Sequence, residues 1–465
     1  MKSRKTSAST VSQKISEFVA ALRLRNVSRE VRDAAKLHLL DGLATMLGGS
    51  VEPSSRLLRR RFRPKKNAGG ATVPGCREKF SAEHAALING TQGHVLDYDD
   101  SQLATLPSRP PGQQTHPTGP VLAAVMALAE TRRKSGAAFL TSYIAGIEVA
   151  CRLGDAVDPS HYLDGFHPTG TLGVFGAAAA CARLIELEPQ AIRHALGIAG
   201  TFASGLRANR GTYAKGLNAG HAAENGVIAA TLAADGFSAS ENIFDDPMGF
   251  FAAACRGRVD RKLLKFGRPF FFAKPGIAIK LYSCAGVLHP ALDVVRELRA
   301  QYAIAAEAIE HIHVSLDADA ARPLVYKNPK DSLQAKFSMN FAVAVALIDG
   351  AAGLKQFTEA RVADPAVRKL MSRVELVAFC RRTTKRNRVA TTIEIRTRDG
   401  KVHRSEALIA RGHPKLAPSR AEIEDKFRQC AAGVLPARQT EAFLKTFWNL
   451  ERIASIAAWL RPLRR

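Results

Sequence analysis

The sequence has few cysteines, and none of them lie close together. Seven cysteines are scattered over 465 residues, and no two form the C-x-x-C pair of zinc or redox sites. An iron–sulfur centre needs several thiolates brought together, so this spacing disfavours one. Long apolar runs are also missing, because residues 121–129 and 341–348 fall well short of the ~20 residues that cross a bilayer. We therefore expect reduced thiols and no membrane span.

Acidic residues are scarce relative to basic ones. The chain has 67 lysines and arginines against 42 aspartates and glutamates, which gives a formal net charge of +25. Such a charge could favour binding of nucleic acid, anionic lipid or an acidic small molecule. The basic clusters at 56–66, 381–388 and 461–465 carry no interleaved aromatic residue except Phe62, and they match no zinc-finger or RNA-recognition pattern. This favours a solvated basic surface over specific nucleic-acid binding.

The N-terminal residues argue against a secretory signal as well. Residues 1–14 are basic and rich in Ser and Thr, but the apolar patch at 18–24 is short and is interrupted by Arg23. We expect a cytoplasmic protein with a basic N-terminal tail.

The apolar pattern between residues 9 and 236 predicts a large helical domain. Apolar residues recur three and four positions apart over this range. One helix is expected to begin at Ser28, with Glu30 in its first turn, and to end at Gly48 and Gly49. Later segments are rich in Ala and Gly, so we expect their helices to pack closely.

The pattern changes after about residue 265 and predicts a smaller mixed part. Alternation of apolar and polar residues at 311–316 predicts a strand, and alternation on both sides of residues 399–400 predicts a hairpin with an Asp-Gly turn. Two helices are expected at 286–302 and 332–350. Helical pattern returns from Ser419, so the tail could fold back on the first domain.

The tetrapeptide His-Pro-Thr-Gly occurs twice, at 116–119 and at 167–170, each time before an Ala-rich stretch. Pro in a first turn followed by such sequence marks a helix start. His116 and His167 would then stand beside unpaired backbone N–H groups and the positive end of a helix dipole, which suits a carboxylate and lowers the pKa of an imidazole. A neutral His there could accept a proton. The alternative is two ordinary helix starts with a capping His.

Three aspartates, Asp97, Asp99 and Asp100, follow at the expected end of a helix. Acidic side chains there oppose the helix dipole, which suggests a functional reason for their placement. The D-x-D-D spacing lacks the further acidic ligands and Gly of a calcium loop, so it argues against a metal. A carboxylate that orients a His or takes a proton, and a solvated acidic turn, both stay open.

Two lysines complete the candidate set. Lys215 precedes a glycine-punctuated helix entry at 216–223, where an ammonium group could pair with an anionic ligand, although the order of a P-loop is absent. Lys280 opens the segment that leads into the helix at 286–302. Taken alone, either lysine is more often a surface charge. His311 and His313 form H-x-H, but strand alternation already explains them, so we expect no metal site there.

These segments together make the chain resemble the MmgE/PrpD family over nearly its whole length. The resemblance implies a mainly α fold, with a large helical domain built from both chain ends and a smaller inserted α/β domain, at 1–267, 268–407 and 408–465. It also implies a homodimer and a cofactor-free site between the domains. The motifs that carry it lie at 39–50, 89–100, 116–117, 165–171, 215–223, 280–289 and 336–338.

The resemblance also implies a site and an activity. Ser101 stands where a Thr is usual, Ser283 replaces a common Pro, and segment 102–115 is longer than in decarboxylase-like members. Lys215, Lys280 and Ser101 would bind substrate carboxylates. Carried over residue by residue, the family's site falls on Asp97, Ser101, His116, His167, Lys215 and Lys280.

Known members of the family include 2-methylcitrate dehydratase, cis-aconitate decarboxylase and an iminodisuccinate epimerase. We therefore expect a metal-free lyase for a small polycarboxylate, foremost one that dehydrates a 2-methylcitrate-like hydroxy acid. Decarboxylation or epimerisation of a related polycarboxylate is the first alternative. A non-catalytic protein that binds anions or nucleic acid is the alternative of another class.

Overall fold

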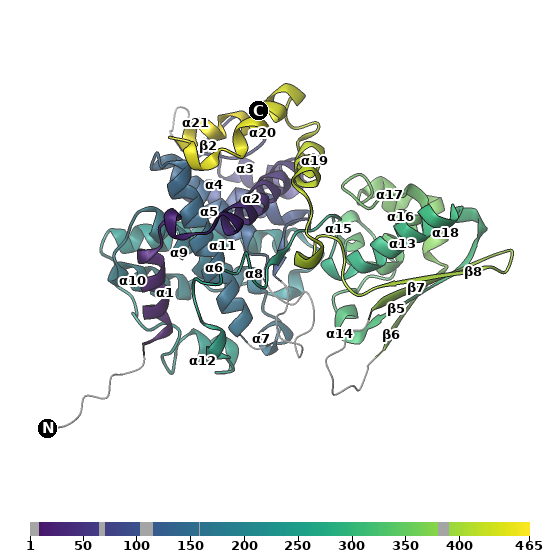
Figure 1. Cartoon of the computed structure of the whole chain (residues 1–465), viewed down its shortest axis with the longest axis horizontal. Coiled ribbons are helices and arrows are strands. Elements are labelled where there is room, and N and C mark those ends of the chain that lie inside the picture. Colours follow the sequence, from purple (N-terminus) through teal and green to yellow (C-terminus); the bar gives the residue numbers. More distant parts are fainter. Residues whose placement is uncertain (1–8, 65–69, 103–114, 158, 380–389) are drawn as a thin grey trace.

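The chain folds into two parts, each with its own hydrophobic core (Figure 1). The computed structural model describes residues 9–64, 70–102, 115–157, 159–379 and 390–465. The larger core takes residues from Val11 to Ile279 and again from Ile423 to Leu463, and the smaller core takes residues from Tyr282 to Ile395. The predicted fold class is confirmed, because both chain ends build the helical part and the α/β part is inserted between them. The domain bounds at 267 and 407 stay a prediction.

The larger part is a bundle of helices, several of them fully buried. The short helices are α7 (Ser160–Leu163), α8 (Pro168–Thr171), α12 (Phe250–Cys255) and α21 (Ile456–Leu460). The longer ones are α1 (Val11–Ala21), α2 (Arg29–Gly49), α3 (Pro53–Arg61), α4 (Ala82–Val95), α5 (Thr118–Thr131), α6 (Gly136–Ala156), α9 (Gly173–Leu184), α10 (Pro189–Thr201), α11 (Tyr213–Ala234), α19 (Arg420–Ala431) and α20 (Ala437–Phe447).

Local sequence signals account for where these helices begin and how closely they pack. Ser28 caps α2 by accepting the backbone N–H of Val31, as its sequence predicts. Glycines let α4 and α11 approach closely, because a Cβ added to Gly90 would lie 2.8 Å from the Cα of Gly220. This contact matters for the site, since α11 carries Lys215 and α4 ends two residues before Asp97.

Helix α6 is long and apolar enough to cross a membrane by length and composition. This helix does not form an uninterrupted apolar run in the sequence, because polar residues are spread through its 21 residues. Of its most apolar stretch, 83% is buried inside the protein, as in the core helix of a folded domain. Burial therefore accounts for its composition. No other helix among the described residues meets the same criterion.

The smaller part is a four-stranded sheet in the order β6-β5-β7-β8. Strand β5 (Ile309–Asp317) is parallel to β6 (Val374–Phe379) and antiparallel to β7 (Thr391–Thr397), which pairs with β8 (Val402–Ala407). The predicted strand at 311–316 and the hairpin around Gly400 are both confirmed. Figure 1 shows the helices gathered mainly over one face of this sheet. They are α13 (His289–Tyr302), α14 (Ala318–Ala321), α15 (Ser332–Ala335), α16 (Met339–Asp349), α17 (Glu359–Ala363) and α18 (Pro365–Met371).

One predicted helix, at 332–350, is wrong as a continuous element. Helix α15 ends at Ala335, and α16 starts at Met339 after Ser338 caps it by accepting the N–H of Phe341. The break lets Lys336 turn inward, where its ammonium group donates to the carbonyl and hydroxyl of Ser283 at 3.1 and 2.9 Å. Helical periodicity alone does not reveal such a buried polar contact.

Candidate active site

A two-stranded pairing brings the two halves of the site together. Asp97 and Lys280 are 183 residues apart in the chain. Strand β3 (Ser101–Gln102) pairs with β4 (Ile277–Ala278), and Ser101 lies opposite Ala278. The segments that follow α4 and precede α13 therefore run side by side, and each places one charged side chain in the same pocket.

A buried lysine from the C-terminal segment holds these two segments. Lys426 of α19 donates to the backbone carbonyls of Tyr98 at 2.7 Å and Lys280 at 2.8 Å, and it forms an ion pair with Asp41 at 2.5 Å. Burial raises the pKa of Asp41 to about 6, although Lys426 acts in the opposite direction. No local pattern in the sequence marks Lys426, which contacts residues more than 100 positions away.

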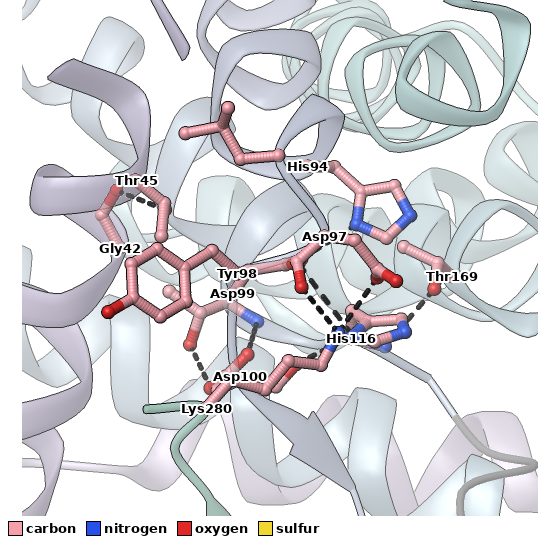
Figure 2. Close-up of polar contacts among 12 residues, drawn as sticks. Gly42, Thr45, His94, Asp97, Tyr98, Asp99, Asp100, His116, Thr169 and Lys280 are labelled. Atoms are coloured by element: carbon pink, nitrogen blue, oxygen red, sulfur yellow. Dashed lines mark hydrogen bonds and ion pairs between the residues drawn. The ribbon is translucent and has the colours of Figure 1, made fainter. Parts of the chain in front are cut away.

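Asp97 lies between two ammonium groups. Its backbone takes the left-handed conformation at the end of α4, with φ of 51°, which Asp tolerates better than most residues. Its Oδ1 accepts hydrogen bonds from Lys280 at 2.8 Å and from Lys215 at 3.0 Å. Burial alone would raise the pKa of Asp97, but the two lysines hold it well below its usual value. Figure 2 shows Lys280 reaching toward this network while the Tyr98 ring points the other way, toward Gly42 and Thr45.

His116 is a neutral imidazole with a free lone pair. Its Nδ1 lies 2.7 Å from the carbonyl oxygen of Asp100, which can only accept, so Nδ1 carries the proton and Nε2 the lone pair. Burial first, and then the charge of Lys280, lowers the pKa of His116 to about 3. Its ordinary value is 6.5, so the ring stays neutral near pH 7 and can act as a base.

His167 has the opposite arrangement. Its Nδ1 lies 3.1 Å from the amide nitrogen of Asn218, which can only donate, so the proton is on Nε2. Burial, followed by the neighbouring His94 and Lys215, lowers the pKa of His167 well below its usual value. The neutral ring therefore offers an N–H group from Nε2. The expected helix starts at both histidines are confirmed, since α5 begins at Thr118 and α8 at Pro168, but burial rather than a helix dipole is the main cause of the low pKa values.

His94 is a third imidazole in the cluster, and the sequence did not single it out as a site residue. Its ring centroid lies 4.8 Å from that of His116 and 5.4 Å from that of His167. The Lys215 ammonium donates to its Nε2 at 3.2 Å, so its Nδ1 donates to Asp99 at 2.7 Å. His94 thus connects a catalytic lysine candidate to a buried carboxylate. The five-residue spacing of His94 and Asp99 across a helix end was a usable signal.

Three of these groups also have the spacing of a metal site. The ligand atoms of His94, Asp99 and His116 lie within 4.8 Å of one another. However, Nδ1 of His94 donates to Asp99 while its Nε2 accepts from Lys215, so this ring has no lone pair left for an ion, and His116 could offer only its Nε2. The charge of Lys280 also acts on His116 and opposes a cation there. These residues fit a hydrogen-bonded network better than a metal centre, and the predicted cofactor-free site stays a prediction.

All six predicted site residues line one pocket between the two parts of the chain. The longer segment named in the sequence, 102–115, lies outside the described residues except for its two ends. Among the described residues, four cationic side chains and one carboxylate border the pocket, and two of the cations, Arg207 and Arg210, were not predicted. The lining residues are Asp97, Ser101, His116, Tyr162, His167, Leu206, Arg207, Arg210, Lys215, Lys280, Ala285, Gly286, Val287, Pro323 and Phe337.

A concave pocket that combines cations with neutral imidazoles is typical of an enzyme that handles small anions by acid–base chemistry. The comparison with known proteins makes this specific. The chain belongs to the MmgE/PrpD family, because residues 13–262 match the MmgE/PrpD N-terminal domain and residues 282–452 match the MmgE/PrpD C-terminal domain. The predicted family is confirmed.

Relatives with assigned activities match along most of this chain. Cis-aconitate decarboxylase from Homo sapiens is 25% identical over 460 residues, which cover 95% of this chain and 92% of that protein. Cis-aconitate decarboxylase from Aspergillus terreus is 28% identical over 372 residues, covering 76% and 74% respectively. The mouse protein of the same name is 24% identical over 466 residues, covering 98% and 93%. The chain is thus a member of an enzyme family whose matched relatives are lyases.

Proposed function

We propose that the protein is a lyase for a small tricarboxylate and that it decarboxylates a cis-aconitate-like substrate. The charge balance of the pocket carries the proposal. Lys215, Lys280, Arg207 and Arg210 face a single carboxylate, Asp97, so with neutral histidines three positive charges are uncompensated. A substrate with three carboxylates matches that charge. The names of the matched relatives support the same substrate class.

The reaction requires one bond to break and one proton to be delivered. Loss of CO₂ from a CH₂ group next to the double bond leaves an electron pair delocalised toward a remaining carboxylate. Lys215 and Lys280 could stabilise this charge, and both side chains are largely shielded from solvent, which strengthens the interaction. The Nε2–H of His167 then protonates carbon, and the imidazolate that is left, with the Asn218 amide at its Nδ1, regains a proton from solvent. One proton is consumed for each CO₂ released.

Dehydration of a 2-methylcitrate-like hydroxy acid is the second candidate. The observation that favours it is the pair of imidazoles in opposite tautomers. The lone pair on Nε2 of His116 could take the proton next to a carboxylate, while the Nε2–H of His167 protonates the departing hydroxyl to form water. Solvent then takes the proton from His116 and returns one to His167, so both rings regain their starting state. Electron balance needs no oxidant or metal in either reaction.

Proton and product analysis in heavy water separates the two candidates. The protein is incubated with cis-aconitate, 2-methylcitrate, citrate or iminodisuccinate, and products are followed by NMR. We expect CO₂ release from cis-aconitate, with one deuterium bound to carbon in the product. A new alkene from 2-methylcitrate without CO₂ release would select dehydration. If no substrate loses a group or exchanges a carbon-bound proton, the lyase proposal is rejected.

Metal independence, a homodimer and a cytoplasmic location belong to the same proposal. Dialysis against a chelator should leave turnover unchanged, because His94 and Asp97 are already engaged by Asp99, Lys215 and Lys280, none of which needs an ion. A tenfold loss that added metal restores would contradict it. Sedimentation analysis of the purified chain tests the homodimer.

A further inference from the structure

A second hollow, far from the pocket just described, is lined mainly by arginines. It measures ≈ 650 Å³, which is in the range of small-molecule sites. Figure 1 shows its elements, α3 and β2 (Lys79–Phe80), beside α20, α21 and the end of the chain, away from the smaller part. Its charged lining residues are Arg59, Arg60, Arg63, Arg77, Glu78 and Arg465.

Backbone contacts fix the turn that brings these arginines together. Strand β1 (Ala71–Thr72) pairs with β2, and the turn between them leads through Gly75. The N–H of Gly75 donates to the carbonyl of Leu463 at 2.8 Å, and the N–H of Arg465 donates to the carbonyl of Cys76 at 3.4 Å. A side chain at Gly75 would not fit, because its φ is +77° and a Cβ would lie 2.5 Å from Oγ of Ser50. Three separate segments are therefore held around one hollow.

Within the part of the chain that the structure describes, four arginines of this hollow form no ion pair, although the charge of Glu78 acts on Arg59 and Arg63. Arg59, Arg60, Arg63 and Arg77 make no hydrogen bond or ion pair through their side chains with any other described residue. Among the described residues, Glu78 is the one side-chain carboxylate in the lining, and it accepts from the Cys76 thiol at 3.0 Å. Arg428, by contrast, is an arginine of the surface that is paired, with Glu441 at 2.7 Å.

Helix capping explains only part of this cluster. Basic residues in the last turn of α3 compensate the helix dipole, and this accounts for Arg59 and Arg60. Arg63 lies beyond the helix and Arg77 lies on the β1–β2 turn, so the dipole does not explain them. Together Arg59, Arg60, Arg63 and Arg77 exceed the charge of the Glu78 side chain by three, without counting Arg465.

We infer that this hollow is a binding site for an oligophosphate, either inorganic or carried by a nucleotide. Guanidinium groups pair with phosphate oxygens through two parallel hydrogen bonds, and several of them around one hollow match a chain of phosphates better than a single anion. The hollow shares no lining residue with the lyase pocket. The inference is therefore independent of the proposed function.

Calorimetric titration of the full chain with tripolyphosphate, at constant ionic strength, tests the site. We expect saturable one-to-one binding. The variant Arg59→Gln/Arg63→Gln should weaken it at least about tenfold, since each lost charge-assisted pair is worth roughly that factor. The matched control is Arg396→Gln/Arg404→Gln, which changes two exposed arginines of β7 and β8 and should bind as the original does.

Titrations with further ligands distinguish the sources of the phosphate. Equal affinity for ATP and tripolyphosphate assigns the whole interaction to the phosphate chain, and tighter binding of ATP adds a contact to the nucleoside. Circular dichroism should show both variants folded. Absence of saturable tripolyphosphate binding, or equal weakening in both variants, overturns the inference. So does binding of duplex DNA, but not of tripolyphosphate, that depends on Arg59 and Arg63.

Discussion

The two His-Pro-Thr-Gly copies have the same four residues but different surroundings. The first copy leads into α5, a helix of 14 residues, whereas the second starts α8, which has four residues before α9 follows. A Cβ added to Gly119 would make only ordinary contacts at 3.7 Å, but one added to Gly170 would lie 2.3 Å from the carbonyl of Ser204. The glycine is thus required by close packing in the second copy alone.

The same difference extends to the chemistry of the histidines. The carbonyl of Asp100 fixes the proton of His116 on Nδ1, and the amide of Asn218 fixes that of His167 on Nε2. The repeated local motif therefore places each imidazole ring at the start of a helix. Partners from elsewhere in the chain decide whether the ring offers a lone pair or an N–H group to the pocket.

The largest effect is expected when either ring is removed. His116→Gln and His167→Gln keep a polar side chain of similar length but cannot transfer a proton, so kcat should fall by ~10²–10⁴-fold in each variant. Turnover of the substrate identified by NMR measures this, with circular dichroism as the control for folding. Near-full turnover in either variant would remove that histidine from the mechanism.

Nitrogen-15 NMR tests the comparison without any substitution. We expect both rings to stay neutral between pH 8 and pH 5, because burial and nearby lysines place the pKa of His116 at about 3 and that of His167 well below its usual value. The shifts should report a proton on Nδ1 for His116 and on Nε2 for His167. Identical tautomers for the two rings would contradict the assigned difference.

The two copies also differ in the contacts that hold them in place, and the variant Lys426→Met tests the contact that holds the first copy. Lys426 holds the segment that leads to the first copy through the carbonyl of Tyr98. Its loss leaves Asp41 buried without its cation, which should lower the free energy of unfolding by ~3–5 kcal/mol near neutral pH. Urea denaturation of variant and parent measures the difference.

The effect of Lys426→Met should grow as the pH rises. The pKa of Asp41 is about 6 in the folded chain and 3.8 as its ordinary value, so burial favours the neutral acid. A group with a raised pKa contributes stability below its ordinary value and loses it as pH rises through the folded value. Without Lys426 the charged form is still less favourable, so the variant should be closer to the parent at pH 5 than at pH 8. An equal loss at both pH values would contradict the role given to Asp41.

A smaller effect is expected when only the partner of His167 changes. In Asn218→Asp, a carboxylate would accept from Nδ1 and move the proton away from Nε2, which should lower kcat roughly 10–100-fold with little change in KM. Asn218→Leu removes the donor without forcing the other tautomer, so its loss should be smaller. If both variants lose kcat equally, Asn218 serves packing rather than the tautomer.

Asn218 also shows why the sequence could predict only part of the site. Asp97, Ser101, His116, His167, Lys215 and Lys280 each belong to a local motif, and all six line the pocket. The contacts between His167 and Asn218 and between Lys426 and Tyr98 join residues 51 and 328 positions apart, and no local pattern records them. Arg207 and Arg210 fall in a segment without a motif, and only the fold brings them to the pocket.

The fold was predictable where the burial of one face determined a whole helix or strand. Periodic burial predicted α2, and alternation predicted β5 and the hairpin of β7 and β8, because each buries one face. The helix expected at 332–350 failed at the single place where Lys336 reaches Ser283. Specific polar contacts of this kind outweigh periodicity, and they are concentrated near the pocket.

The smallest effect is expected at the contact between the two copies, where Oγ1 of Thr169 accepts the backbone N–H of His116 at 3.1 Å. Thr169→Val leaves that N–H without a partner, which should destabilise the chain by about 1–3 kcal/mol. The change in kcat should stay below about tenfold, because the carbonyl of Asp100 still fixes the ring of His116. Thr169→Ser keeps the hydroxyl and should match the parent. A loss in Thr169→Val as large as that of His116→Gln would mean that the hydroxyl itself takes part in the reaction.

A residue of the second copy thus supports the histidine of the first. Combining Thr169→Val with Asn218→Leu should therefore lower kcat by more than the product of the two separate fold-losses. A loss equal to that product would show that the two copies work independently.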